Sequence, residues 1–118
     1  MEEIYLDANF LIDLIENRGN ADVLEQLNLK YVSISTLSVH ISFYSTKKKV
    51  PHELTRILLS ELKIVDLTKE ILDKSLQGPT SDLEDNIQLY SAVEADCDYF
   101  LTHDKTLLKL KFFGKLRI

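Results

Sequence analysis

Short apolar runs of two kinds alternate along the chain. Runs rich in β-branched and aromatic residues predict strands, and the stretches between them place apolar residues at helical spacing. The predicted strands cover residues 3–7, 30–35, 63–67 and 98–102, and KLRI (115–118) adds a candidate edge strand. Strands that alternate with helices indicate a parallel sheet covered on both faces. We therefore expect an α/β fold with a parallel β-sheet of four or five strands flanked by helices.

The helices after the first and second strands are marked by caps and by apolar spacing. Asn20 is a candidate N-cap for a short helix that follows the first one. On the helix after the second strand, Leu37, Ile41 and Tyr44 share one face. Ser35 or Thr36 can cap this helix.

The longest predicted helix, residues 82–96, begins in the acidic stretch SDLEDNIQ (81–88). Ser81 and Glu84 match the S-x-x-E capping box, in which each side chain accepts a hydrogen bond from the backbone of the other residue. This pattern assigns the helix start to Ser81 and Glu84. It leaves the two aspartates of the stretch to be explained by something else.

Helical angles of about 100° per residue divide the side chains of this helix between two faces. Glu84, Gln88 and Ser91 fall on a narrow polar face, whereas Asp82 and Asp85 fall within the wider apolar arc. A carboxylate turned toward the interior must be hydrogen-bonded, ion-paired or metal-bound, because unpaired burial costs several kcal/mol. Asp85 is therefore the first candidate for a site, and Asp82 the second.

Two further acids stand where a predicted strand gives way to a helix. Asp7 follows the first strand, and Asp104 follows the strand at 98–102. The carboxyl ends of parallel strands share one edge of the sheet, where α/β proteins bind ligands. An isolated aspartate at such a junction is also commonly just an N-cap.

Carboxylates that converge without basic partners repel one another and are stabilised by a divalent cation. Mg²⁺ and Mn²⁺ prefer oxygen ligands and keep several waters, so about two to four carboxylates suffice. Such a cation can activate water for attack on a phosphodiester. The pattern of acids therefore indicates metal-dependent phosphodiester hydrolysis.

Length and composition are those of a compact globular chain. The 118 residues suit a single domain spanning 1–118. Cys97 is the only cysteine, so it offers neither a disulfide nor a cysteine zinc site, and a buried thiol is expected. No apolar stretch reaches the roughly 18 residues of a membrane span, and the acidic N-terminus is unlike a signal peptide. We therefore expect a cytoplasmic protein with no membrane partner.

The net charge of −5 argues at first against a nucleic-acid partner, because polyanions bind basic surfaces from which counterions are released. The distribution of charge weakens this objection. Residues 105–118 contain five basic and no acidic side chains, and Lys47, Lys48 and Lys49 form a second basic run. Either run could equally be a solvated surface, so charge alone leaves a nucleic-acid partner open.

Two blocks of the sequence resemble the PIN-domain nucleases, in particular the VapC-like toxins of toxin–antitoxin pairs. IYLDANFLIDLI (4–15) is similar to the family's opening motif, and DLEDNIQLYSAVEADCDYFLTHDKTLL (82–108) is similar to its closing motif. The resemblance implies a ribonuclease, an antitoxin partner that wraps the nuclease, and a homodimer. Phe10, Leu14 and Leu24 could serve such an interface, or could lie in the core, which is the commoner fate of apolar residues.

The resemblance also implies a role for individual residues. Asp7, Asp85 and Asp104 match the acids that bind Mg²⁺ or Mn²⁺ in a PIN site and carry catalysis there. Asn9 and Thr102 match small polar residues that support those acids.

The chain departs from the family pattern at one position. The family usually places a glutamate on the helix after the second strand, and His40 stands there in this chain. Imidazole is a poor ligand for Mg²⁺ and an acceptable one for Mn²⁺, and when protonated it can contact a phosphate. Three outcomes stay open: Asp82 supplies the fourth carboxylate, three acids hold the metal, or the site is weakened.

Two other hypotheses compete with the ribonuclease. A phosphoacceptor receiver domain would use Asp66 as the phosphorylated residue and Lys105 as its lysine, although receiver domains carry paired acids after the first strand and YLDAN offers one. A non-catalytic PIN-like module would bind RNA or a protein without turnover. His40 and the overall acidity motivate this last hypothesis.

Overall fold

The computed structural model describes residues 1–17 and 26–118. The helices are α1 (Ala8–Glu16), α3 (Thr36–Thr46), α4 (Glu53–Ser60), α5 (Lys69–Ser75), α6 (Leu83–Glu94) and α7 (Lys105–Leu110), and η1 (Leu29–Tyr31) is a 3₁₀ turn. The strands are β1 (Ile4–Leu6), β2 (Val32–Ser35), β3 (Lys63–Val65), β4 (Tyr99–Leu101), β5 (Phe112–Phe113) and β6 (Leu116–Arg117). The helix predicted to begin at Asn20, and Leu24 within it, lie outside the described residues.

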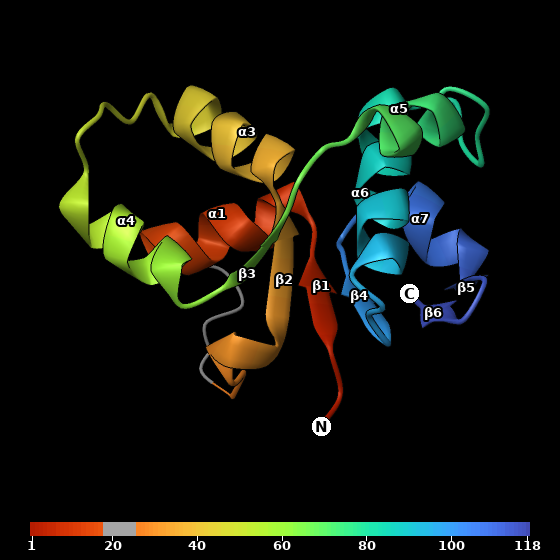
Figure 1. The fold of residues 1–118 in the computed structure, drawn as a ribbon, viewed down its shortest axis with the longest axis horizontal. Coiled ribbons are helices and arrows are strands. Elements are labelled where there is room, and N and C mark those ends of the chain that lie inside the picture. Colours follow the sequence, from red (N-terminus) through yellow and green to blue (C-terminus); the bar gives the residue numbers. More distant parts are fainter. Residues whose placement is uncertain (18–25) are drawn as a thin grey trace.

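The strands form one sheet in the order β3-β2-β1-β4-β6-β5. Every neighbouring pair is parallel except β5 with β6, which is antiparallel. In Figure 1, α1, α3 and α4 gather on the β3 side of the molecule, and α5, α6 and α7 gather on the β4 side. The predicted α/β fold with a parallel sheet between helices is confirmed. Among the residues that the structure describes, no helix is long and apolar enough to cross a membrane.

The C-terminal part of the sheet differs from the prediction. KLRI was expected to be an edge strand, but β6 lies between β4 and β5, and β5 forms the edge. The described sheet therefore has six strands rather than four or five. Gly114, with a φ of 63°, makes the turn that pairs β5 with β6. Strands of two residues are too short to leave an alternating pattern in the sequence.

The sheet divides the buried apolar side chains into two clusters, because neighbouring residues of a strand point to opposite faces. Tyr5 belongs to the first cluster and Leu6 to the second. The first consists of Tyr5, Leu89, Ala92, Cys97, Phe100, Leu107 and Leu116, and the second of Leu6, Phe10, Leu11, Val32, Ile34 and Leu62. Cys97 is a buried thiol, as predicted. Phe10 is core, and Leu14 packs against the same cluster.

The prediction for the faces of α6 is wrong. Gln88 and Ser91, expected on the polar face, are 1% and 0% exposed, whereas the apolar Val93 is 46% exposed. The reason is that α6 packs on a polar layer. Gln88 Oε1 accepts hydrogen bonds from the Tyr5 hydroxyl and, at 3.0 Å, from the Ser38 hydroxyl.

The apolar face of α3 is not its most buried face. Leu37 and Ile41 are partly buried and Tyr44 is 81% exposed, whereas the buried residues of the helix are Ser38 and Ser42. The Ser42 hydroxyl donates to the Ser38 carbonyl oxygen at 2.8 Å. Since the Ser38 hydroxyl donates to Gln88 of α6, both buried hydroxyls of α3 have a hydrogen-bond partner.

The sheet order excludes the receiver-domain hypothesis. Receiver domains have the order 2-1-3-4-5, which places the third strand inside the sheet. Here β3 is an edge strand, and Asp66, which follows it, is exposed.

Candidate metal centre

Asp7 links the first strand, the first helix and the neighbouring strand β4. Its backbone N–H donates to the Leu101 carbonyl oxygen at 3.1 Å, which holds the ends of β1 and β4 together. Its side-chain Oδ1 accepts from the Phe10 backbone N–H at 3.1 Å, so Asp7 is the N-cap of α1. The side chain is buried, with 7% of the residue exposed. The cap therefore holds one carboxylate in place at the carboxyl edge of the sheet.

Asp104 repeats this arrangement one strand further along the sheet. Its Oδ1 accepts from the Leu107 backbone N–H at 3.0 Å, which makes it the N-cap of α7. Its own backbone N–H donates to the Thr102 hydroxyl oxygen at 3.0 Å. The Thr102 hydroxyl also lies beside the Asp7 carboxylate and lowers its pKa. The buried Thr102 thus lies between the two acids.

The start of α6 differs from the predicted capping box. The N-cap is Asp82, whose Oδ1 accepts from the Asp85 backbone N–H at 3.0 Å, and neither Ser81 nor Glu84 caps the helix. The Asp82 backbone N–H donates to the Thr80 hydroxyl oxygen at 3.1 Å. Aspartate caps a helix as well as serine does, so the local pattern could not decide between them.

A buried asparagine selects this start. Asn86 accepts from the Thr80 backbone N–H at 2.9 Å and donates to the Ser75 carbonyl oxygen at 2.9 Å. These contacts tie the loop after α5 to the first turn of α6. The loop held in this way places Asp82 at the cap, which leaves the carboxylates of Glu84 and Asp85 without a capping role.

Asp85 is the acid most strongly affected by its neighbours. Partial burial, then the charges of Asp82, Asp104, Glu84 and Asp7 in that order, raise the pKa of the Asp85 carboxyl to about 6. A carboxylate is affected in this way only by charges that lie nearby. Gln88 of the same helix contacts Tyr5 of β1 and Ser38 near the start of α3, which places the start of α6 at the same edge as Asp7 and Asp104.

Glu84 and Asp7 show the same crowding of negative charge. Burial, then the charges of Asp82 and Asp7, raise the pKa of Glu84. Burial raises the pKa of Asp7, while the Thr102 hydroxyl, the backbone N–H groups of Phe10 and Asn9, and His103 oppose this rise. Sequence reasoning missed Glu84, because the capping box seemed to account for it. The signal was the adjacent pair of acids in the first turn of α6, where both can face the edge of the sheet.

The donors fit a hard divalent cation in kind. All are carboxylate oxygens, and within residues 1–17 and 26–118 no ion pair engages Asp82, Glu84, Asp85 or Asp104. As the side chains stand, however, no group of three or more His, Cys, Asp or Glu residues in that part of the chain is arranged to hold a metal. Asp7 and Asp104 are held by their caps, so Asp85 is the side chain that would have to turn toward them.

Two predicted supporting residues lie apart from these contacts. The side chain of Asn9 is exposed, and only the backbone N–H of this residue acts on the Asp7 carboxylate, whose pKa it lowers. His40 is exposed and lines a hollow with Phe43, Tyr44 and the lysines after α3. No acid of the carboxyl edge lines that hollow.

A mostly parallel α/β sheet with carboxylates gathered at one edge is the class of protein that the fold and the site define. The profile of the PIN domain family matches residues 4–112, so the chain belongs to the PIN domain family. A comparison with curated proteins finds no match.

Two solved structures show the same fold. One is a chain of a toxin-antitoxin complex from Klebsiella pneumoniae, with a TM-score of 0.75 and 23% identity over 98% of this chain and 97% of that chain. The other is VapC20 from Mycobacterium tuberculosis, described as a sarcin-ricin loop cleaving toxin, with a TM-score of 0.68 and 9% identity over 98% of this chain and all of that one.

Proposed function

We propose that the protein is an endoribonuclease that hydrolyses RNA phosphodiester bonds with the help of Mg²⁺ or Mn²⁺. The contact that supports this most is the one made by Thr102, whose hydroxyl joins Asp7 to Asp104 across neighbouring strands. The crowding of Asp85 with these acids adds to it. Membership of the PIN family and the likeness to a toxin described as cleaving the sarcin-ricin loop agree with the proposal.

Asp7, Asp85 and Asp104 would hold the cation, with Asp82 as a fourth carboxylate. When bound, the cation would activate a water for attack on phosphorus and neutralise charge on the phosphodiester. The caps keep Asp7 and Asp104 oriented, and Thr102 keeps their spacing. Asp85 has no capping duty and is free to turn toward the other two. In the absence of the cation, mutual repulsion among these acids opposes their convergence.

RNA cleavage by the purified protein tests this assignment. With Mn²⁺ or Mg²⁺ the protein should cut RNA, and chelation of the cation should stop it. Asp85→Asn should lower the rate by about 100-fold or more, because a ligand to the cation is lost. The matched control is Asp73→Asn, an exposed aspartate on α5, which should keep the wild-type rate. If Asp85→Asn cuts at the wild-type rate, the assigned site is wrong.

A PIN-like module that binds without cutting is the second candidate. His40 standing at the family's glutamate position favours it, and so does the spacing of the acids within the described residues, which does not hold a metal as it stands. Such a module would bind RNA in Mn²⁺ and leave it intact. Cleavage that depends on Mn²⁺ and on Asp85 excludes it.

We also propose a cytoplasmic protein that forms a homodimer and has an antitoxin partner. The relative from Klebsiella pneumoniae comes from a toxin-antitoxin complex, which supports such a partner. A small protein encoded beside this one should, when co-expressed, copurify with it and suppress RNA cleavage. Light scattering of the purified protein should give the mass of two chains, and the mass of one chain would contradict the dimer.

A further inference from the structure

The end of α3 and the turn after it surround a hollow whose chemistry is opposite to that of the acidic edge. The hollow has a volume of about 710 Å³ and is lined by His40, Phe43, Tyr44, Ser45, Lys47, Lys48 and Lys49. None of these residues is acidic. In a chain with a net charge of −5, this hollow is therefore a local concentration of positive charge.

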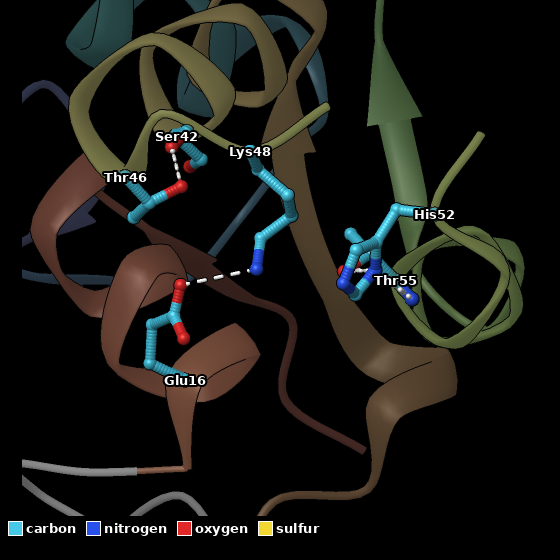
Figure 2. Close-up of polar contacts among 6 residues, drawn as sticks. All are labelled: Glu16, Ser42, Thr46, Lys48, His52 and Thr55. Atoms are coloured by element: carbon cyan, nitrogen blue, oxygen red, sulfur yellow. Dashed lines mark hydrogen bonds and ion pairs between the residues drawn. The ribbon is translucent and has the colours of Figure 1, made fainter. Parts of the chain in front are cut away.

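The three lysines have different roles. Lys48 forms an ion pair with Glu16 at 3.2 Å, and its side chain is 13% exposed. Figure 2 shows Lys48 reaching from the turn after α3 toward Glu16 at the end of α1. This ion pair holds the turn against α1 and neutralises the charge of Lys48. Lys47 and Lys49 are exposed, and neither forms an ion pair with any described residue.

Lys47 also occupies a backbone position that does not favour lysine. It is the C-cap of α3 with a φ of 55°, in the left-handed region that glycine or asparagine adopts at lower cost. The backbone alone gives no reason for a lysine there. Its ammonium group is exposed and is available to contact an anion.

An exposed aromatic ring completes the surface. Tyr44 is 81% exposed, and His40, Tyr44 and Lys47 stand at helical positions i, i+4 and i+7, which form one face of α3. Basic side chains beside an exposed aromatic ring are the combination that binds single-stranded nucleic acid, through phosphate contacts and base stacking. A paired base in a duplex cannot stack on such a ring, so an unpaired strand is the ligand that uses the whole surface.

The helix α3 connects the carboxyl edge of the sheet, where the acids lie, with the lysines of the hollow. α3 begins directly after Ser35, the last residue of β2, and β2 is the neighbour of β1, which ends at Asp7. From its start to Lys47 the helix rises about 16 Å. The face of α3 thus leads from the carboxyl edge of the sheet outward to the lysines, a length that a short oligonucleotide can span.

We propose that the surface formed by His40 and Tyr44 of α3 and by Lys47 and Lys49 of the turn after it binds single-stranded RNA beside the bond to be cut. This inference rests on the proposed function, because it supplies the attraction for phosphate that the acidic edge lacks. Lys47 and Lys49 contact phosphates, and Tyr44 stacks on an unpaired base. An acidic protein segment would satisfy the lysines but would leave the Tyr44 ring uncovered, so RNA is the ligand that fits better.

Fluorescence anisotropy with a labelled single-stranded RNA of about 12 nucleotides tests this, since sites of this kind cover about 4–16 nucleotides. The full chain carries Asp85→Asn in every sample, so that the RNA is not cut. Adding Lys47→Gln and Lys49→Gln should weaken binding and reduce the slope of log affinity against log salt by about 1.4, since each phosphate contact to a single strand contributes about 0.7. Lys69→Gln with Lys109→Gln, two exposed lysines elsewhere, changes the net charge equally and should leave that slope unchanged.

Three further variants separate stacking and backbone effects from charge. Tyr44→Ala should weaken binding at least about fivefold without changing the salt slope, whereas Tyr44→Phe should bind like the parent. Lys47→Gly relaxes the left-handed cap and should raise thermal stability while it weakens binding. A duplex of the same sequence should bind more weakly than the single strand, and should be insensitive to Tyr44→Ala.

The outcomes distinguish this inference from the proposed function. If the lysine and tyrosine variants bind RNA as the parent does, or if polyglutamate occupies these lysines and RNA does not, the inference is overturned. Cleavage is measured separately with Asp85 restored. Unchanged cleavage in the Lys47, Lys49 and Tyr44 variants overturns the inference and leaves the nuclease standing. Binding at these residues with no cleavage overturns the nuclease and leaves only an RNA-binding surface.

Discussion

The two edges of the sheet carry acids in different surroundings. At the amino edge, Glu3 forms an ion pair with Lys63 at 2.7 Å, and Asp98 accepts from the Glu3 backbone N–H at 2.9 Å. At the carboxyl edge, Asp85 and Glu84 find no cation among the described residues and are instead close to other acids. Acids that stabilise a fold are paired, and acids left facing one another are candidates for binding a ligand of positive charge.

The sharpest test of this contrast exchanges one aspartate at each edge. Asp104→Asn should reduce RNA cleavage by about 100-fold or more, because the amide is a far weaker ligand for a hard cation. The fold should survive, because asparagine caps a helix as well as aspartate does. Asp98→Asn, at the amino edge, should cut like the wild type. The rate of RNA cleavage with Mn²⁺ is measured for both variants. An equal loss of rate in Asp104→Asn and Asp98→Asn would mean that the acids at the two edges do not differ in role.

The contact that joins Asp7 to Asp104 can be broken without changing charge. Thr102→Val removes the hydroxyl and should slow cleavage by about 10-fold or more, as losing a group that orients ligands usually does. It should also lower the free energy of unfolding by about 1–2 kcal/mol, because buried polar groups lose a partner. Thr102→Ser keeps the hydroxyl and serves as the control. Kinetics and urea denaturation are measured together, and a loss of stability with unchanged cleavage would make Thr102 purely structural.

The crowding of Asp85 predicts a variant that is more stable and less active. Because its pKa is raised to about 6 in the folded state, the folded protein holds this proton more tightly than the unfolded chain. The free energy of unfolding therefore falls as pH rises from about 4 through about 6. Asp85→Asn removes this loss and should gain about 1 kcal/mol at pH 7.5, a figure reduced for the partial exposure of the group.

Urea denaturation across pH measures this effect. The gain from Asp85→Asn should shrink toward zero near about pH 3, below the ordinary aspartate pKa of 3.8, where the wild-type carboxyl is protonated in both states. Asp73→Asn is the control and should show no such dependence. A gain that is equal at about pH 3 and pH 7.5 would mean that repulsion among the acids is not its cause.

The smallest expected effect is at the amino edge. Glu3→Gln should lower the free energy of unfolding by about 0.5 kcal/mol at low salt, because it breaks a partly exposed ion pair with Lys63. The difference should vanish in about 1 M NaCl, which screens such pairs. Glu61→Gln, an exposed residue without an ion pair among the described residues, is the control. If Glu3→Gln stabilised the protein, acids at both edges would be destabilising and the contrast between the edges would be lost.

The predicted fold succeeded where the signals were local. Alternating strands and helices, and aspartates at the ends of β1 and before α7, follow from patterns that each segment carries by itself. Asp7 and Asp104 are N-caps as well as site candidates, so the two interpretations of these residues are compatible. A cap fixes the carboxylate in place through one of its oxygens.

The wrong predictions concern helices that pack against polar residues. Gln88 and Ser38 are buried against each other and Tyr5, so helical positions that looked solvent-facing form the packed face. Hydropathy cannot predict this, because a polar residue is expected inside only when the residue that satisfies it is already known. The same ambiguity assigned the start of α6 to Ser81 instead of Asp82.

The sequence by itself determined the order of strands and helices, the family resemblance and the acids at the strand ends, because periodicity and capping act within a few residues. Only the tertiary structure decided which acids lie near one another. It placed Glu84 and Asp85 near Asp7, gave the cap to Asp82, and set His40 in a basic hollow. These outcomes depend on contacts between segments far apart in the chain, such as the ties that Asn86 and Thr102 make.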